Sequence, residues 1–251
     1  FQNCLLGVCE PASLLGYNVL ITTSNVHDIS ELQSLVESNR VDGMLLTRAL
    51  EDDRALQYLS QVNFPTALTG TCRYDNIIQV DTDNEGAAEK MTTLLIGKGF
   101  RRFAFLVKNM SYNVDRKRHE GFCRALIKNG ISEKDQLFYN GSIRMEFLDA
   151  IIENIISKKV ECIICGDDEI CTMVMSRLQA EGYRIPKDVA IASLYNSTNL
   201  DCYSPAVTAV SVAASQMGGA AVRQLIQRLR GENYEKKTML DYDILFRKST
   251  N

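Results

Sequence analysis

Short apolar segments recur along the chain and alternate with amphipathic stretches of helical period. The apolar segments are rich in Val, Ile and Leu, so each predicts a buried β-strand. They span residues 17–23, 41–47, 65–70, 77–81, 103–108, 160–166 and 189–195. The amphipathic stretches that predict helices span residues 28–39, 83–99, 116–130 and 168–182. Strands that alternate with helices predict parallel sheets in an α/β fold.

Residues at the ends of the predicted helices agree with this pattern. Asp28 and Asp83 stand at helix starts, where a carboxylate can accept hydrogen bonds from free backbone amides. Gly99, Gly130 and Gly182 follow the last turns of three helices. A helix commonly ends with a residue in the left-handed conformation, which glycine adopts without steric cost. We therefore expect these positions to bound helices.

The composition is that of a folded, water-soluble chain. Its 251 residues allow one large domain or two ordinary ones, at roughly 100 to 200 residues per domain. Hydrophobic residues make up 45% and charged residues 24%, so a sizeable core can form. The formal charge of -3 is too acidic for a nucleic-acid surface by charge alone. We see no apolar run that could span a bilayer and no basic leader, so we expect no membrane partner.

The eight cysteines are scattered through apolar segments, which favours reduced thiols in a cytoplasmic protein over a disulfide framework. Cys162 and Cys165 have the spacing of a redox or zinc pair. They lie in a predicted strand, however, where residues three apart point to opposite faces. Only His27 and His119 could add imidazole ligands. We therefore expect no metal, no cofactor and no catalytic triad.

Polar residues follow several predicted strands, and no glycine-rich phosphate loop does. In open parallel sheets ligands bind outside the carboxyl ends of the strands, so these residues mark the expected site. The set comprises Thr69, Gly70, Asp81, Lys108, Asn109, Gly166, Asp167, Asp168, Tyr195, Asn196 and Ser197. For any one of them, helix capping or loop structure is an equally good interpretation.

A series of short motifs follows in a fixed order. The segments are Val41-Asp42-Gly43-Met44-Leu45-Leu46, Val80 to Ala87 with Asp83-Asn84 at its centre, Arg118-His119-Glu120-Gly121-Phe122, Cys165 to Ile170, Gly182 to Val189, Pro205 to Val210, and Phe246 to Thr250. They resemble VDGIIL, the segment beginning VxxDN and ending GA, RxxGF, the ND pair, GxxIPxDV, PxLTTV and a terminal RxST. Because these motifs occur in the same order as in that family, the chain resembles the effector-binding core of the lactose-repressor (LacI/GalR) family of transcription regulators.

The resemblance covers nearly the whole chain and implies a fold shared with periplasmic sugar-binding proteins of type I. Two three-layer subdomains, each with a parallel sheet, would be joined by three crossovers and hold a sugar-sized effector in the cleft between them. The N-terminal subdomain would take residues 1–80 and 213–238, and the C-terminal subdomain residues 81–212 and 239–251.

The resemblance also implies particular effector-binding residues. Arg118 occupies the arginine of RxxGF, and a guanidinium can fork onto hydroxyls, carboxylates or phosphates. Asp168 matches the acid of the ND pair, and Asp167 replaces the usual asparagine. A carboxylate can accept two sugar hydroxyls, but either aspartate also suits a helix N-terminus. For Arg118 a surface salt bridge is the alternative.

Three further positions complete the implied site. Tyr195 and Asn196 stand where the family usually has two acids, which leaves the identity of the effector open. Phe1 aligns with an aromatic residue that packs on the ligand at the start of the family's first helix. The family's first strand and its DNA-binding headpiece of about 60 residues would precede Phe1, and we expect both to be absent from this chain.

The function implied is the effector-sensing and dimerising core of a cytoplasmic LacI-type regulator, whose partners would be a sugar or related metabolite, a second copy of the chain and operator DNA. The alternative is the substrate-binding protein of a sugar ABC transporter, which uses the same fold. An enzyme is the third hypothesis, and it lacks a paired nucleophile and base. The expected reduced state of the cysteines and the terminal Phe246 to Thr250 segment favour the regulator.

Overall fold

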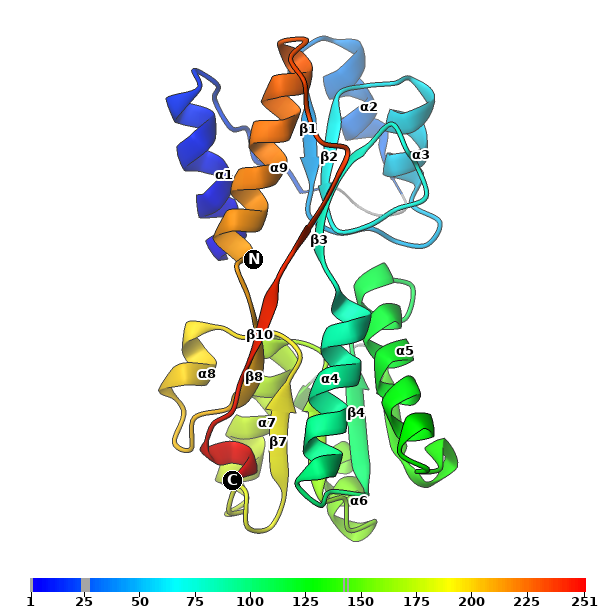
Figure 1. The fold of residues 1–251 in the computed structure, drawn as a ribbon, viewed down its shortest axis with the longest axis vertical. Coiled ribbons are helices and arrows are strands. Elements are labelled where there is room, and N and C mark those ends of the chain that lie inside the picture. The colour runs from blue at the N-terminus through cyan, green and yellow to red at the C-terminus, as the bar shows by residue number, and fades with distance from the viewer. Residues whose placement is uncertain (1, 24–27, 142, 144) are drawn as a thin grey trace. The chain divides into compact units, whose positions relative to one another are not determined.

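A computed structural model describes residues 2–23, 28–141, 143 and 145–251 of the chain (Figure 1). These residues form two compact units, and each contains a sheet with helices on both faces. The first unit comprises Phe1–Thr82, Ser111–Asn113 and Ala213–Asp241, and the second comprises Asp83–Met110, Val114–Val212 and Tyr242–Asn251.

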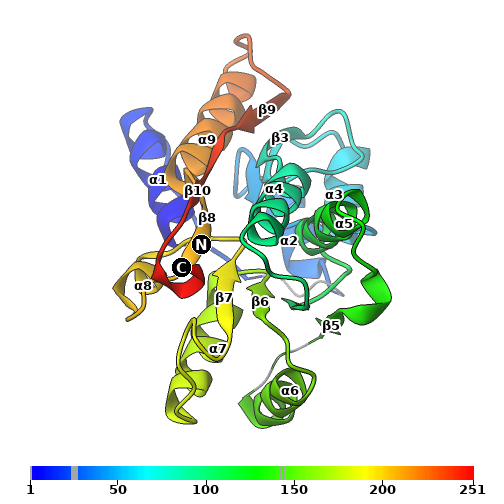
Figure 2. The same ribbon diagram turned by 60° about the horizontal axis from the view of Figure 1, so that its bottom comes forward.

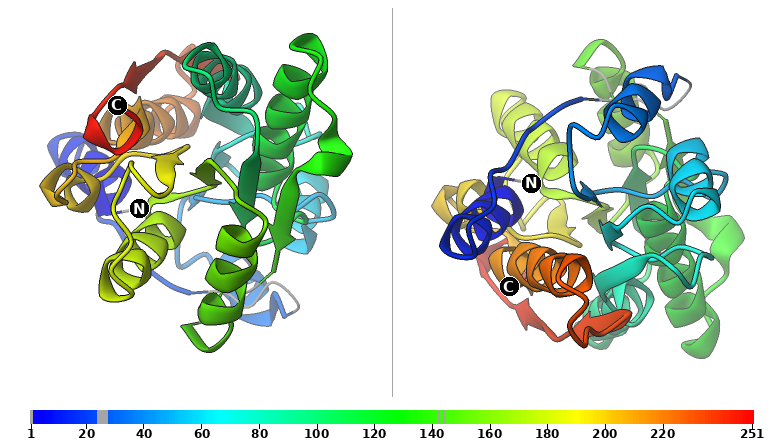
Figure 3. Two further views of the ribbon diagram at one scale, coloured as in Figure 1. Left: turned by 90° about the horizontal axis from the view of Figure 1, so that it is seen from below. Right: turned by 90° about the horizontal axis from the view of Figure 1, so that it is seen from above.

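The first unit is built on a four-stranded parallel sheet in the order β1-β2-β3-β9. Its strands are β1 (Met44–Leu46), β2 (Thr66–Thr69), β3 (Ile78–Thr82) and β9 (Lys237–Leu240). Its helices are α1 (Gln2–Leu14), α2 (Ser30–Glu37), α3 (Arg54–Gln61) and α9 (Ala214–Leu229). Successive residues of β2 point to opposite faces, since Ala67 packs with α9 while Leu68 packs with α3. The unit therefore has three layers, with α1 beside α9 on one face (Figure 3).

The strand predicted over residues 17–23 is wrong. No strand in the described part of the chain pairs with this segment, and residues 18–23 are exposed, with Leu20 at 64% and Ile21 at 59%. A β-strand is stable only when a neighbouring strand satisfies its backbone groups. The apolar composition of residues 17–23 suits a strand, but no neighbouring strand pairs with it, so the segment forms no strand and residues 18–23 are exposed.

The second unit is built on a six-stranded sheet in the order β10-β8-β7-β6-β4-β5. Its strands are β4 (Phe103–Val107), β5 (Leu137–Asn140), β6 (Cys162–Cys165), β7 (Ala190–Ser193), β8 (Thr208–Val212) and β10 (Tyr242–Leu245). Its helices are α4 (Asn84–Gly97), α5 (Asn113–Lys128), α6 (Met145–Ser157), α7 (Asp168–Ala180) and α8 (Thr198–Cys202), with short 3-10 turns at Glu133–Asp135 and Lys248–Thr250. Only β10 runs antiparallel to its neighbour among these described strands. The parallel α/β fold predicted from the sequence is therefore confirmed.

Helices lie on both faces of this second sheet (Figure 2). A hydrophobic core fills the space between the sheet and the helices on each face. One core packs β4, β6 and β7 against α4 and α5, and it contains Cys162. The other packs the same strands against α6, α7 and α8, and it contains Cys165. The two cysteines therefore point to opposite faces, as predicted for a strand. All eight cysteines are free thiols, which agrees with the expected reduced state.

Most of the predicted helix ends are confirmed. Asp83 caps α4, because its carboxylate accepts a hydrogen bond of 2.8 Å from the amide of Gly86. Gly99, Gly130 and Gly182 have φ values of 105°, 68° and 79°. The assignment of Asp28 as an N-cap is wrong by one residue: α2 starts after Ile29, and the carboxylate of Asp28 instead accepts from the amide of Ser30 at 3.0 Å.

Candidate effector site

The arginine of the RxxGF segment reaches its position because two helices of the second unit approach closely. A Cβ atom on Gly121 would lie 2.1 Å from the carbonyl oxygen of Glu85, so only glycine lets α5 pack this tightly against α4. Arg118 stands three residues before Gly121 and therefore lies on the same face of α5. The glycine of the motif thus places the arginine beside the start of α4.

Arg118 is buried, with 7% of its surface exposed, and its guanidinium is held from two directions. Its Nε donates to Asn84 Oδ1 at 3.1 Å, and its Nη1 donates to the carbonyl oxygen of Gly166 at 2.7 Å. Asn84 is the first residue of α4, while Gly166 follows β6. These two contacts bring the predicted arginine to the carboxyl end of a central strand, where open α/β sheets bind ligands.

The two aspartates that follow Gly166 have different surroundings. Asp167 caps α7, since its carboxylate accepts from the amide of Ile170 at 2.9 Å, and it forms an ion pair of 2.9 Å with Lys108. Asp168, the first residue of α7, is half-buried and makes no hydrogen bond or ion pair to the other described residues. The structure therefore separates a capping acid from one whose carboxylate can accept hydroxyl groups.

Lys108, at the end of β4, neutralises part of this acidic edge. Besides Asp167, its ammonium group contacts the carboxylate of Glu169 in a close ion pair. Burial lowers the pKa of Lys108, but the bonds to Glu169 and Asp167 outweigh burial and leave the pKa raised. The positive charge of Lys108 is therefore already paired with Asp167 and Glu169. Asp168 is a further acidic residue in the first turn of α7.

The predicted residues at the end of β7 are tied to the last segment of the chain. Asn196 Oδ1 accepts a hydrogen bond of 2.9 Å from Arg247 Nη1, which also donates to the carbonyl oxygen of Val207 at 2.6 Å. The carbonyl of Tyr195 accepts from the hydroxyl of Ser193 at 2.6 Å. These bonds give Asn196 a structural role in anchoring Arg247. The predicted Phe1 lies outside the described residues.

Two further polar residues of this edge were missed as site residues by the sequence interpretation. Asn84 was noted only as part of a motif, and it lies 34 positions from Arg118 in sequence. Asp115 is buried at 6% exposure and accepts from the amide of Asn109 at 3.0 Å. A polar residue directly after a helix cap was the available signal for Asn84. Its partner could not be read from the sequence.

The cysteine pair that has the spacing of a metal site does not form one. Burial raises the pKa of both Cys162 and Cys165, so neither is poised as a thiolate. Across the described ranges, no three His, Cys, Asp or Glu side chains are grouped closely enough to hold a metal ion. Both cysteines are therefore core residues.

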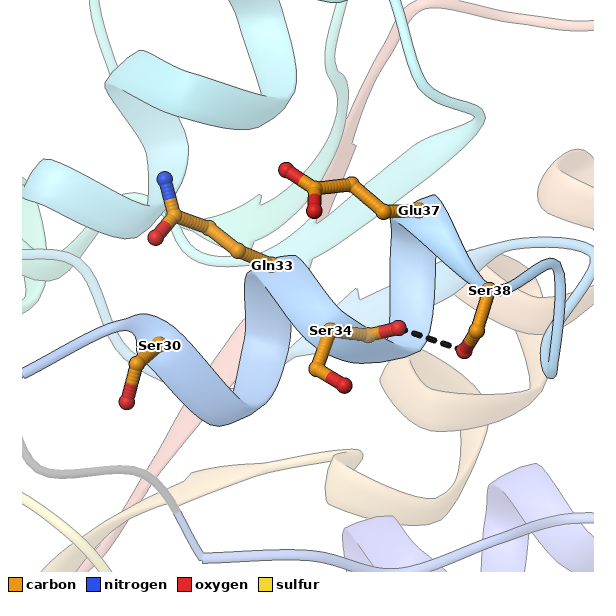
Figure 4. Close-up of a pocket in the computed structure, with 5 residues that line it drawn as sticks. All are labelled: Ser30, Gln33, Ser34, Glu37 and Ser38. Atoms are coloured by element: carbon orange, nitrogen blue, oxygen red, sulfur yellow. Dashed lines mark hydrogen bonds between the residues drawn. The ribbon is translucent and has the colours of Figure 1, made fainter.

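A shallow hollow of about 400 Å³ lies along α2 of the first unit (Figure 4). Its lining consists of Ser30, Gln33, Ser34, Glu37 and Ser38, all on one helix or its C-terminal cap. The hydroxyl of Ser38 donates to the carbonyl of Ser34, so one of the polar groups is already satisfied within the helix. A ligand site needs groups that converge from several elements, and this surface has none.

Comparison with known proteins places this fold in a family. Residues 92–250 match the family model described as the periplasmic binding protein-like domain. The chain belongs to this family. Relatives of the chain include the HTH-type transcriptional regulator CelR of Thermobifida fusca, which is 26% identical over 99% of this chain and 75% of CelR. Catabolite control protein A of Priestia megaterium is 24% identical over 97% of this chain and 76% of that protein.

Solved structures of the family agree with these relatives. A putative transcriptional regulator LacI from Bacillus cereus subsp. cytotoxis superposes with a TM-score of 0.91 at 28% identity, covering 99% of this chain and 91% of the other. The CelR–cellobiose complex superposes with a TM-score of 0.87 at 26% identity, covering 99% and 78%. These matches confirm the resemblance to LacI-type transcription regulators and favour that function over a transporter substrate-binding protein. Among the described helices, none combines the length and the apolar character that a membrane span requires.

Proposed function

We propose that the chain is the effector-sensing core of a cytoplasmic LacI-type regulator that binds an uncharged sugar at the carboxyl edge of its second unit. The observation that carries the proposal is the guanidinium of Arg118, held against the carbonyl of Gly166, directly before the acidic pair. Arginine and aspartate side chains placed together supply donors and acceptors for vicinal hydroxyls. The family's relatives are named as regulators, not enzymes, which supports a role in sensing without catalysis.

The charge at this edge favours a neutral ligand over a phosphorylated one. Asp167, Asp168 and Glu169 crowd the start of α7, and the nearby Lys108 is already paired with two of them. The remaining carboxylate would repel a phosphate and offset its attraction to Arg118, whereas sugar hydroxyls can donate to the carboxylate and accept from the guanidinium. The cellobiose bound by CelR is such an uncharged ligand, so it is the first sugar to test.

The test is calorimetric titration of the chain with cellobiose, followed by maltose, glucose and glucose 6-phosphate. We expect one of the neutral sugars to bind and the phosphorylated sugar to bind weakly. Arg118→Ala should weaken the binding by about a hundredfold, because the charge-assisted hydrogen bonds proposed between the guanidinium and the sugar hydroxyls are lost. Arg124→Ala is the matched control, since Arg124 lies on the same helix but pairs at the surface with Glu85 and Glu89. Equal affinity of the wild type and Arg118→Ala contradicts the assignment.

Two wider parts of the proposal have separate tests. We propose that the core forms a homodimer, which sedimentation velocity measures directly. We also propose that effector binding changes the affinity of the full protein for operator DNA through a headpiece outside this chain. A helix-turn-helix encoded upstream of Phe1 supports that step, and a secretory leader there contradicts it.

A further inference from the structure

A row of aromatic rings joins α5 to the second sheet. Phe122 of α5 stacks on Phe105 of β4, with ring centroids 4.7 Å apart, and meets Phe103 edge-on at 6.1 Å. His119 continues the row, because its ring lies 5.7 Å from that of Phe105 and 4.3 Å from that of Phe138 on β5. Aromatic pairs at about these separations stabilise a core beyond the area that they bury. The row therefore helps to hold α5 on the sheet.

Among the five rings of this row, His119 alone can gain a charge, since imidazole takes up a proton near neutral pH. The ring is half-buried, and 3.6 Å separate its Nε2 from the Sγ of Cys123. Three titratable groups face it, namely Glu120 and Cys123 of α5 and Glu133 of the 3-10 turn, while β4 and β5 contribute only phenylalanine rings to the row. Burial lowers the pKa of His119, and the carboxylates of Glu133 and Glu120 oppose this effect only in part.

His119 and the effector site are connected through the backbone of α5. Arg118 is the preceding residue, and its Nη1 donates to the carbonyl oxygen of Gly166 from the same turn of the helix. A charged imidazole is strongly hydrated, so protonation favours its departure from the phenylalanine rings into water. The turn of α5 that carries Arg118 then loses its aromatic contacts with β4 and β5. The guanidinium loses the rigid support that a binding group requires.

We infer that His119 is an acid-sensitive switch of the effector site: its protonation loosens α5 on the sheet and, with it, the guanidinium of Arg118. This inference rests on the proposed function, because it takes Arg118 as the effector-binding group. The folded chain binds this proton less readily than the unfolded chain, whose pKa is 6.5. The stabilising contribution of the neutral ring is therefore present above pH 6.5 and is lost as the pH falls through the lowered pKa.

The first measurement needs no ligand. The sequence has one other histidine, so His27→Gln leaves a single imidazole whose NMR signals follow His119 through a pH titration. In the ¹⁵N-labelled chain, the Nε–H signal of Arg118, identified by its loss in Arg118→Lys, reports on the guanidinium. We expect this signal to shift with the same midpoint as the imidazole and to stay constant in His119→Phe, which keeps a ring in the row. Unrelated midpoints overturn the inference.

The second measurement is titration with cellobiose, maltose and glucose at pH 7.5 and at pH 5.5. We expect about a fivefold loss of affinity at the lower pH in the wild type and in the matched control His27→Gln. The loss should disappear in His119→Phe and in His119→Gln, since neither side chain takes up a proton. An equal loss in the wild type and in both His119 variants overturns the switch.

The failure of the proposed function has a different signature. If the wild type binds none of these sugars at either pH, the proposed function fails, and the switch has no effector site to control. The ligand-free NMR signals still show whether the protonation of His119 moves the guanidinium of Arg118. The two failures are therefore distinguishable.

Discussion

The two units differ in how completely they use their apolar segments. In the second unit, strands β4, β6 and β7 are buried along their whole length, and two hydrophobic cores cover the sheet. In the first unit, β2 and β3 are equally buried, but β1 is only half-buried and most of the apolar segment 17–23 is exposed. Both units carry the same kind of sequence pattern. The difference shows that an apolar segment contributes to stability only where it pairs with another strand and is buried under a helix.

Two isoleucines give the sharpest measure of this comparison. Ile164 in β6 is fully buried, so Ile164→Ala should cost about 2 to 5 kcal/mol of unfolding free energy. Ile21 is 59% exposed, so Ile21→Ala should change it by less than about 0.5 kcal/mol. Denaturant unfolding of the two variants measures both values. A cost at Ile21 near that at Ile164 would show that residues 17–23 are buried in solution.

Close helix packing is a feature that the two units share, and glycine substitutions test it. A Cβ on Gly121 would lie 2.1 Å from the Glu85 carbonyl, and one on Gly218 in α9 would lie 2.2 Å from the Cys4 carbonyl. We expect each Gly→Ala change to cost about 1 to 3 kcal/mol by overpacking. Gly97→Ala in α4 is the control, because its Cβ would meet nothing within 4 Å. That change should stabilise the helix by about 0.5 to 1 kcal/mol, and thermal unfolding distinguishes the two signs.

Within the second unit, the two adjacent aspartates should separate stability from binding. Asp167→Ala removes the cap of α7 and should cost about 1 kcal/mol. Asp168→Ala removes a carboxylate that has no partner among the described residues, so stability should hardly change while sugar affinity falls. Thermal unfolding and sugar titration of both variants check this pairing. The reverse pattern would exchange the two roles.

The smallest expected effect is a pH dependence at the Cys123 thiol of the second unit. Burial, with a contribution from the Glu133 carboxylate, raises its pKa from 9.0 to about 11. The folded state therefore holds this proton more tightly than the unfolded state. The resulting stabilisation is fully present below pH 9 and is lost as the pH rises to about 11. Cys123→Ala should flatten the unfolding free energy across that window, and an identical slope in wild type and variant would contradict the assignment.

Much of the fold could be predicted because the local patterns and the tertiary structure agree. Six of the seven predicted strands form, since each of them gains a hydrogen-bonded neighbour. Local signals also located the cap at Asp83 and the glycine at position 130. The failure at residues 17–23 has a different cause, because pairing depends on segments far away in the chain.

The site was only partly predictable for the same reason. The RxxGF segment pointed to Arg118, but its partners Asn84 and Gly166 stand 34 and 48 residues away. The sequence could not say which of Asp167 and Asp168 caps the helix. That choice depends on the backbone at the start of α7, where the extended conformation of Asp167 aims its carboxylate at the amide of Ile170.

The sequence by itself determined the alternation of strands and helices, the ends of most helices and the family resemblance, since these depend on neighbouring residues and short-range periodicity. Only the tertiary structure decided which apolar segment finds a partner, which acid caps α7 and which groups hold the guanidinium of Arg118. Those outcomes depend on distances between residues far apart in the chain. Such distances are fixed by packing contacts like that of Gly121 against the Glu85 carbonyl, which no local pattern encodes.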